Sequence, residues 1–168
     1  MAVLNWVSDL NTGIEEIDRQ HRRIADYINR LYELRETPDR KLLGEVIGET
    51  VDYTLSHFAF EEGMIEEAGY MFSGPHKSVH ELFIRRVTEI QMRFEAGEDV
   101  SNELHGMLSR WLFNHIRNED RGYVDTVKTY QRMQNKNTKT TEQKIKEEIV
   151  KELEAKHQRK GFFARLFS

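Results

Sequence analysis

Three segments of the sequence place imidazole and carboxylate side chains where an α-helix would bring them to one face. His57 precedes Glu61 by four residues, and His76 precedes His80 by the same step. A step of four turns an α-helix through about 400°, so both members of each pair lie on one face about a turn apart. His21 falls in step with neighbouring isoleucines on the core-facing side of an earlier helical segment. Imidazole and carboxylate groups gathered in this way are typical metal ligands.

A fourth segment carries His115, four residues after Trp111, and Asp120, five residues after His115. On a regular α-helix a step of five turns through about 500°, which would place Asp120 about 140° away from His115. Both side chains reach one site if the helix widens locally into a π-type turn, a distortion that is frequent at functional sites. We therefore predict such a turn between His115 and Asp120.

Five imidazoles directed into one helical core would carry a large desolvation cost without partners. Metal ions bound by neutral imidazole, with carboxylates supplying compensating charge, remove that cost. Five nitrogens plus carboxylate oxygens exceed the four ligands of a tetrahedral zinc and match two six-coordinate ions that share bridging carboxylates. Glu61 and Asp120 are the candidate bridges. This mixed ligation suits iron, although imidazole alone would also accept zinc, copper or nickel.

Four helices are expected to position these residues, because helical apolar spacing is almost continuous and only two prolines occur. The first should begin at a capping box in which Thr12 and Glu15 satisfy each other's backbone donors. The second should have Thr37 as N-cap and Pro38 in its first turn. Short connections favour antiparallel neighbours, so the expected fold class is all-α, an up-down-up-down four-helix bundle with a C-terminal helical extension. The expected helices cover about residues 14–35, 38–69, 74–97 and 101–134.

Charge is divided unevenly along the chain. Residues 136–168 hold nine Lys and Arg against five Asp and Glu, a net charge of +4, whereas residues 1–135 hold 16 against 24, a net charge of −8. We expect a bundle over 1–135 and a charged helical tail over 136–168, with a polar break at 135–141. The tail ends in GFFARLFS, a short amphipathic segment that could bind a membrane surface or a partner, dock on the bundle or fray.

The composition excludes several classes of site and partner. Without cysteine the chain forms no disulfide, thiolate zinc site or iron–sulfur cluster. A net charge of −4 does not favour binding to nucleic acid. The N-terminus MAVLNWVSDL lacks the basic and apolar regions of a secretory signal, and no apolar run approaches the ~18 residues of a membrane span. A cytoplasmic location is expected.

The order of the candidate ligands resembles the hemerythrin family, and within it the prokaryotic bacteriohemerythrins. The family pattern is a lone His, then His-x-x-x-Glu, His-x-x-x-His and His-x-x-x-x-Asp. It matches His21, HFAFE at 57–61, HKSVH at 76–80 and HIRNED at 115–120. The flanking segments GIEEIDRQH and EEGMIEEAGY are also similar to the family, and the resemblance covers about residues 5–130.

The resemblance implies a non-heme, carboxylate-bridged di-iron centre with a bridging oxo or hydroxo group. The second iron would have one protein ligand fewer than the first, which leaves an open position where dioxygen binds reversibly. The implied ligands are His76, His80 and His115 for one iron, His21 and His57 for the other, and Glu61 and Asp120 as bridges.

Residues around the implied ligands also match family positions. Trp111, Leu112 and Ile116 correspond to residues that line the family's dioxygen pocket. Tyr70 and Tyr123 look like phenols that orient the bridging carboxylates. The charge run of Glu62, Glu66 and Glu67 is instead expected on a solvated face.

Three functions are compatible with this centre. A non-enzymatic dioxygen carrier, store or delivery protein is favoured, with an oxygen-consuming enzyme or a membrane surface as a possible partner of the tail. An oxygen or redox sensor that signals through the C-terminal helix is a second hypothesis. A di-iron oxidase, or an enzyme that handles peroxide or nitric oxide, is less favoured, because oxidase-type bundles use paired Glu-x-x-His motifs. Here only Glu154 and His157 have that spacing, and they lie in the tail.

Overall fold

Helices make up all the regular structure of the described chain. The computed structural model describes the backbone of residues 3–34 and 39–166, and side chains as far as residue 152. Within these ranges the all-α class is confirmed, since no strand occurs. The elements are η1 (Ser8–Leu10), α1 (Glu15–Leu34), α2 (Arg40–Glu67), α3 (Ser73–Glu95), α4 (Ser101–His115), the π-helical turn η2 (Ile116–Asp120) and α5 (Arg121–Leu166).

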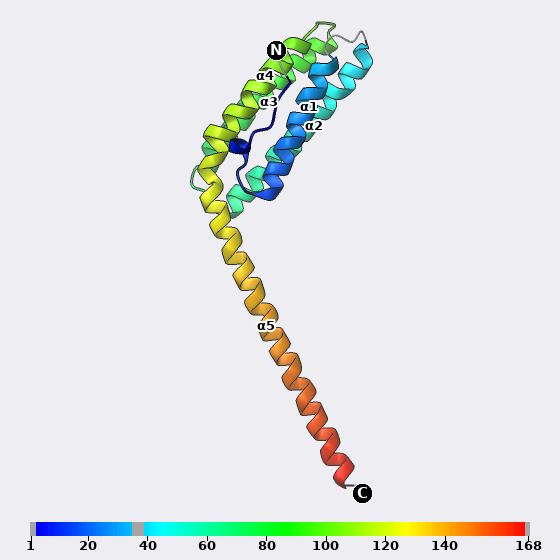
Figure 1. The fold of residues 1–168 in the computed structure, drawn as a ribbon, viewed down its shortest axis with the longest axis vertical. Coiled ribbons are helices and arrows are strands. Elements are labelled where there is room, and N and C mark those ends of the chain that lie inside the picture. The colour runs from blue at the N-terminus through cyan, green and yellow to red at the C-terminus, as the bar shows by residue number, and fades with distance from the viewer. Residues whose placement is uncertain (1–2, 35–38, 167–168) are drawn as a thin grey trace. The chain divides into compact units, whose positions relative to one another are not determined.

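The first four α-helices form an antiparallel bundle, as predicted. α1 packs against α2 and α4, and α2 also packs against α3 (Figure 1). Short connections at 68–72 and 96–100 reverse the chain between successive helices. As a result, the start of α1, the end of α2, the start of α3 and the end of α4 meet at the same end of the bundle.

The start of α1 is capped differently from the predicted box. Thr12 Oγ1 accepts a hydrogen bond from the Ile14 backbone N–H at 3.1 Å, but the reciprocal carboxylate is Asp18. Its oxygens accept from the Thr12 backbone N–H at 2.6 Å, from the Thr12 hydroxyl at 2.8 Å and from the Gly13 N–H at 3.0 Å. The role expected of Glu15 is therefore wrong. Gly13 has a left-handed backbone (φ 74°), so the chain turns before the helix begins and the exposed Glu15 opens the first turn.

α2 begins and ends at local signals. Asp39 caps the start, because its carboxylate accepts from the Leu42 N–H at 2.9 Å. The expected cap residues Thr37 and Pro38 lie outside the described residues, and the helix begins after them. At the other end Gly69 takes a φ of 73°, and the Tyr70 N–H donates to the Ile65 carbonyl at 2.9 Å. This is the 6→1 bond of a Schellman motif, which ends the helix.

α5 is continuous through residues 135–141, so the predicted polar break is wrong. The hydroxyls of Thr138, Thr140 and Thr141 donate to carbonyls four residues earlier, at 2.9 to 3.0 Å. The helix itself satisfies these polar side chains, and the sequence has no Gly or Pro between residues 123 and 160 to end it.

The chain divides into two compact units, residues 1–128 and 129–168. The bundle forms the first unit. In the second, every side chain from 131 to 152 is exposed. Over the described ranges, none of the helices is both long enough and apolar enough to cross a bilayer.

Apolar side chains fill the bundle on both sides of a polar layer. The larger cluster includes Ile24 and Ile28 of α1, and the smaller one contains Ile14 and Ile17 of the same helix. His21 lies between these pairs on the buried face of α1. The polar layer is therefore enclosed by apolar groups along the bundle, which keeps water away from it.

Candidate metal centre

The seven predicted ligand residues all lie in the interior of the bundle. Their side chains come from α1, α2, α3, α4 and η2, so every helix of the bundle contributes to the layer. None is more than 3% exposed to solvent. The residues are His21, His57, Glu61, His76, His80, His115 and Asp120.

The predicted π-type turn is confirmed. η2 covers Ile116–Asp120, directly after His115. A π-turn closes its hydrogen bonds five residues apart, so residues at this spacing share a face as residues four apart do in an α-helix. His115 Nε2 accordingly lies 3.0 Å from Asp120 Oδ1.

One set of donor atoms gathers around His76, His80 and His115. His80 Nε2 lies 3.0 Å from His115 Nε2, and His76 Nε2 lies 3.1 Å from Glu61 Oε1. Ligating atoms of these four residues lie within 4.8 Å of one another. Two donors at right angles around an ion, each about 2.1 Å from it, would lie about 3 Å apart. The observed separations therefore suit neighbouring ligands of a common cation.

A second set gathers around His21 and His57. Their ligating nitrogens and one oxygen of Glu61 lie within 4.8 Å of one another. His57 Nε2 is 3.2 Å from Glu61 Oε2, and His21 Nε2 is 3.2 Å from Asp120 Oδ2. Glu61 and Asp120 thus each direct one oxygen to the first set and the other oxygen to the second. Two carboxylates shared in this way could bridge two metal ions.

The unsatisfied polar atoms of this layer show that the residues fit a cation. Several of them form pairs of an imidazole nitrogen and a carboxylate oxygen 3.0 to 3.2 Å apart, but without the angles of a hydrogen bond. A buried polar group left without a partner costs about 1–3 kcal/mol, and more when it is charged. A cation between the two sets would satisfy these atoms together. Those directed between the two sets are His21 Nε2, His57 Nε2, Glu61 Oε2 and both oxygens of Asp120.

The protonation states of Glu61, Asp120 and His80 favour cation binding. Burial alone would raise the pKa of Glu61, but the adjacent His57 and His76 rings hold that pKa well below its usual value. For Asp120, burial and the Glu61 charge act to raise the pKa, and the nearby His115 and His21 nevertheless keep it below the usual value. Burial lowers the pKa of His80 to about 4. Ionised carboxylates and a neutral imidazole are the forms that ligate metals.

Two hydrogen-bond partners behind the imidazoles were not predicted. Gln20 Oε1 lies 2.9 Å from His57 Nδ1, and Glu62 Oε1 lies 3.0 Å from His80 Nδ1. The expectation that Glu62 lies on a solvated face is wrong, because its side chain is only 17% exposed and faces His80. Both contacts join different helices, so no spacing along the sequence indicates them.

Aromatic rings pack directly against the imidazoles. Trp111 stacks on His115, with ring centroids 4.3 Å apart, and Phe58 stacks on His80 at 3.8 Å. Leu112 and Ile116 are each 1% exposed and belong to the larger apolar cluster. Leu112 and Ile116, which were expected at a dioxygen pocket, thus lie close to His115 along the sequence. Trp111 contacts His115 directly. Phe58, which follows His57 directly, was not singled out from the sequence.

The two predicted tyrosines differ in position. Tyr123 is fully buried, its ring centroid lies 5.6 Å from that of His76, and its hydroxyl has no hydrogen bond. Burial and the charges of Asp120 and Glu61 raise its pKa well above the usual value. Tyr70 is half-buried and packs edge-on against Tyr123, with ring centroids 6.3 Å apart. Tyr123 is therefore the phenol that lies beside the carboxylates.

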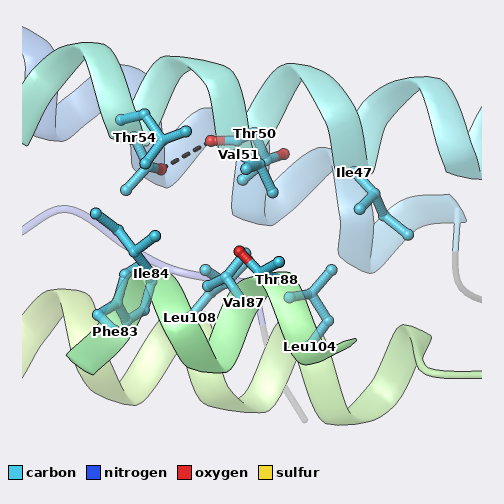
Figure 2. A pocket seen from close by; sticks show the side chains of 11 residues that line it. Ile47, Thr50, Val51, Thr54, Phe83, Ile84, Val87, Thr88, Leu104 and Leu108 are labelled. Atoms are coloured by element: carbon cyan, nitrogen blue, oxygen red, sulfur yellow. Dashed lines mark hydrogen bonds between the residues drawn. The ribbon is translucent and has the colours of Figure 1, made fainter. Parts of the chain in front are cut away.

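A small apolar cavity lies between α2, α3 and α4, one helical turn from the polar layer (Figure 2). Its volume is about 10 Å³. The hydroxyls of Thr50 and Thr54 in its wall donate to carbonyls of their own helix at 2.6 and 2.7 Å, so neither has a hydrogen to donate to a ligand. Phe83, another wall residue, stacks on Trp111 at 3.8 Å. The predicted pocket residues Trp111, Leu112 and Ile116 do not line this cavity.

Comparisons with known proteins agree with this geometry. The family model of the hemerythrin HHE cation binding domain matches residues 12–127, a range that includes all seven candidate ligands. Over 128 residues the chain is 62% identical to the bacteriohemerythrin of Pseudomonas aeruginosa, an alignment that covers 76% of this chain and 84% of that protein. It is 58% identical over 130 residues to the bacteriohemerythrin of Stenotrophomonas maltophilia, covering 77% and 85%.

The fold comparison leads to the same family. A crystal structure of wild-type hemerythrin superposes with a TM-score of 0.72 at 28% sequence identity, covering 75% of this chain and 98% of that one. The family model matches most of the bundle, the relatives are close in sequence and the fold is shared. These three findings do not depend on the ligand geometry described above. The chain belongs to the hemerythrin family.

Proposed function

We propose that this protein binds dioxygen reversibly at a non-heme di-iron centre, and that it stores oxygen, transports it or delivers it to an oxygen-using enzyme. The observation that supports this best is the presence of two imidazole sets that share both carboxylates, inside an apolar bundle. Mixed nitrogen and oxygen ligation suits iron. The relatives named above are bacteriohemerythrins, and a protein of this kind needs no catalytic turnover.

The two sets of donor atoms support the proposed assignment of ligands. Three histidines on one side and two on the other leave the second ion with fewer protein ligands, and so with room for a small ligand. A bridging oxo or hydroxo group would complete the centre. The proposed ligands are His76, His80 and His115 for one iron, His21 and His57 for the other, and Glu61 and Asp120 for both.

The surrounding residues would protect this centre. The proposed ligands would hold iron, which in its ferrous form would supply the electrons needed for reversible dioxygen binding. Trp111, Leu112 and Ile116 would form an apolar wall that admits a small neutral gas and excludes water. Tyr123, which is buried beside the two carboxylates, would help to orient Glu61 and Asp120.

Optical titration of iron-loaded protein tests the proposal. Metal-free protein is loaded anaerobically with ferrous iron, its iron content is measured, and the visible spectrum is followed as oxygen is added and removed. Two irons per chain and an absorption band that appears in air and disappears under argon are expected. Fewer than two irons, or a band that never reverses, would contradict reversible binding. Rapid irreversible oxidation would instead favour a sensor or an oxidase, peroxide- or nitric-oxide-handling enzyme.

A second candidate, an oxygen or redox sensor, is favoured by one observation. α5 begins at Arg121, directly after Asp120, and continues as one helix through residue 166. A conformational change at Asp120 would therefore act on the first residues of α5, a helix that continues in sequence past residue 128. Comparing hydrogen exchange in residues 129–152 between oxygenated and oxygen-free protein separates the two. A carrier shows no change there, whereas a sensor does.

The location and the partners of the tail are also proposals. We place the protein in the cytoplasm, either free or at the periphery of a membrane, with no role in nucleic-acid binding. The basic tail would contact an anionic membrane surface or an oxygen-consuming enzyme. The side chains of GFFARLFS lie outside the described residues. Sedimentation with anionic vesicles, with and without residues 136–168, measures the membrane contribution directly.

A further inference from the structure

In each set of donor atoms, one histidine contacts a side chain of another helix through Nδ1, the ring nitrogen on the side away from the metal layer. In the second set, His57 Nδ1 lies 2.9 Å from Gln20 Oε1 of α1. In the first set, His80 Nδ1 lies 3.0 Å from Glu62 Oε1 of α2. Amide and carboxylate oxygens only accept hydrogen bonds, so in both rings Nδ1 carries the hydrogen. The lone pair of Nε2 is thereby directed at the metal layer in both sets.

The orientation of the Gln20 amide is fixed by a second contact. Its Nε2 donates to Glu16 Oε1 at 2.7 Å, which leaves the amide oxygen for His57. The two histidines therefore have partners of the same geometry and of different charge: a neutral amide behind His57 and a carboxylate behind His80.

The Nδ1 atoms of His21 and His115 do not offset this difference in charge. His21 Nδ1 and His115 Nδ1 are buried without hydrogen bonds, one in each set. Lys77 Nζ lies 3.1 Å from Glu62 Oε2, but its side chain is 49% exposed while that of His80 is fully buried. Solvent screens the interaction of the exposed lysine charge with Glu62 more strongly than it screens the interaction of Glu62 with the buried His80. The first set therefore keeps an additional negative charge behind one of its ligands.

We propose that Glu62 and Gln20 make the two halves of the metal centre unequal, with Glu62 strengthening the half formed by His76, His80 and His115. A hydrogen bond to a charged acceptor is roughly twice as strong as one between neutral groups, and it makes the imidazole a better electron donor. The half with more histidines thus also has the histidine whose Nε2 is the stronger electron donor toward a metal. This half binds its ion first and with higher affinity. The half in which Gln20 contacts His57 binds its ion with lower affinity. This inference rests on the proposed two-ion centre.

Cobalt(II) titration of metal-free full-length protein tests the inference without any measurement of oxygen binding. Occupancy of each half is followed by the paramagnetic shifts of the exchangeable imidazole Nδ1 protons. In the Glu62→Gln variant we expect the affinity of the His76, His80 and His115 half to fall about 10–100-fold, as is usual for loss of a charged partner behind a ligand. The affinity of the other half should change by less than about threefold. Gln20→Glu should tighten the half that contains His57.

Two further variants control the experiment. Glu66→Gln removes the same charge from an exposed position of α2 and should leave both affinities unchanged. Lys77→Met removes the cation that partly neutralises Glu62 and should tighten the His80 half, so the inference can be tested even if Glu62→Gln does not fold.

The outcomes are distinct. Equal weakening of both halves in Glu62→Gln, or no change in either half, would overturn the inference while leaving the two-ion centre intact. Unmodified protein that takes up fewer than two cobalt ions would instead contradict the proposed centre itself, and the inference with it.

Discussion

Two regions of the bundle interior bury their side chains in opposite ways. We call them the apolar end, which is the larger apolar cluster around Ile28, and the polar end, which is the ligand layer together with the smaller apolar cluster beyond it. Away from the ligands, Ile28 and Leu31 of α1 belong to one apolar cluster with Leu43 and Val46 of α2, and apolar packing stabilises this region. Around His21, one helical turn before Ile24, the same helices bury charged and polar atoms that have no hydrogen bonds. The apolar end therefore supplies folding free energy that offsets the cost of burying the polar groups. The predictions below test this division of roles.

Removing a shared carboxylate should have the largest effect, and it should affect only the polar end. Glu61→Ala takes away the group whose two oxygens face both sets, so we expect metal content to fall from two ions per chain to less than about one. The helical circular dichroism should be retained. Metal analysis after gel filtration measures the loss, with the exposed Glu66→Ala as control. Retention of both ions would show that Glu61 is not a bridge.

Chelation should reveal how much the bound ions stabilise the polar end. A ligand present at 1,000 times its dissociation constant stabilises the folded state by about 4 kcal/mol. We expect metal-free protein to unfold at clearly lower denaturant concentration than loaded protein, and to recover when iron is restored. Equal midpoints for the two forms would mean that the polar layer is stable without a cation.

A cavity at the apolar end should destabilise the fold and spare the metals. Ile28 is fully buried, and Ile28→Ala should lower the free energy of unfolding by about 2–5 kcal/mol. Because position 28 lies two turns from His21, the variant should still bind two ions. Urea unfolding and metal analysis on the same samples give both values. Loss of metal in the folded variant would contradict the independence of the two ends.

The aromatic residue at the boundary should affect both ends weakly. Phe58 packs in the larger apolar cluster and stacks on His80 with an interplanar angle of 6°. Phe58→Leu should cost about 1 kcal/mol of stability. We expect metal affinity to fall less than in Glu61→Ala, because Nε2 of His80 is still oriented by Glu62. A complete loss of metal would place Phe58 among the residues essential for the site.

The smallest effect is expected from removal of residues 136–168. Described side chains from 136 to 152 are all exposed, so the truncated bundle should keep its two ions and its unfolding free energy within about 0.5 kcal/mol. Denaturation curves of full-length and truncated protein test this. A larger loss of stability would mean that the tail contributes to the fold of the bundle, against the expected division near residue 135.

The candidate ligands could be predicted because their signal is local. His57 and Glu61, or His76 and His80, are brought together by the turn of a single helix. Even the awkward spacing of His115 and Asp120 was informative, because only a widened turn brings both to one site, and η2 provides it. The continuity of α5 was missed for a related reason. Thr and Asn indicate breaks when their side chains compete with the backbone, and here the threonine hydroxyls bond within the helix.

What the sequence determined by itself was therefore everything that depends on periodicity: the helices, the buried face of each helix, the seven donors and the π-turn. What only the tertiary structure decided was the contacts between helices. Gln20 behind His57, Glu62 behind His80 and Phe58 stacked on His80 depend on the rotation and axial offset of packed helices. Periodicity specifies which face a helix buries, whereas the packing of side chains from several helices fixes which atoms on those faces meet.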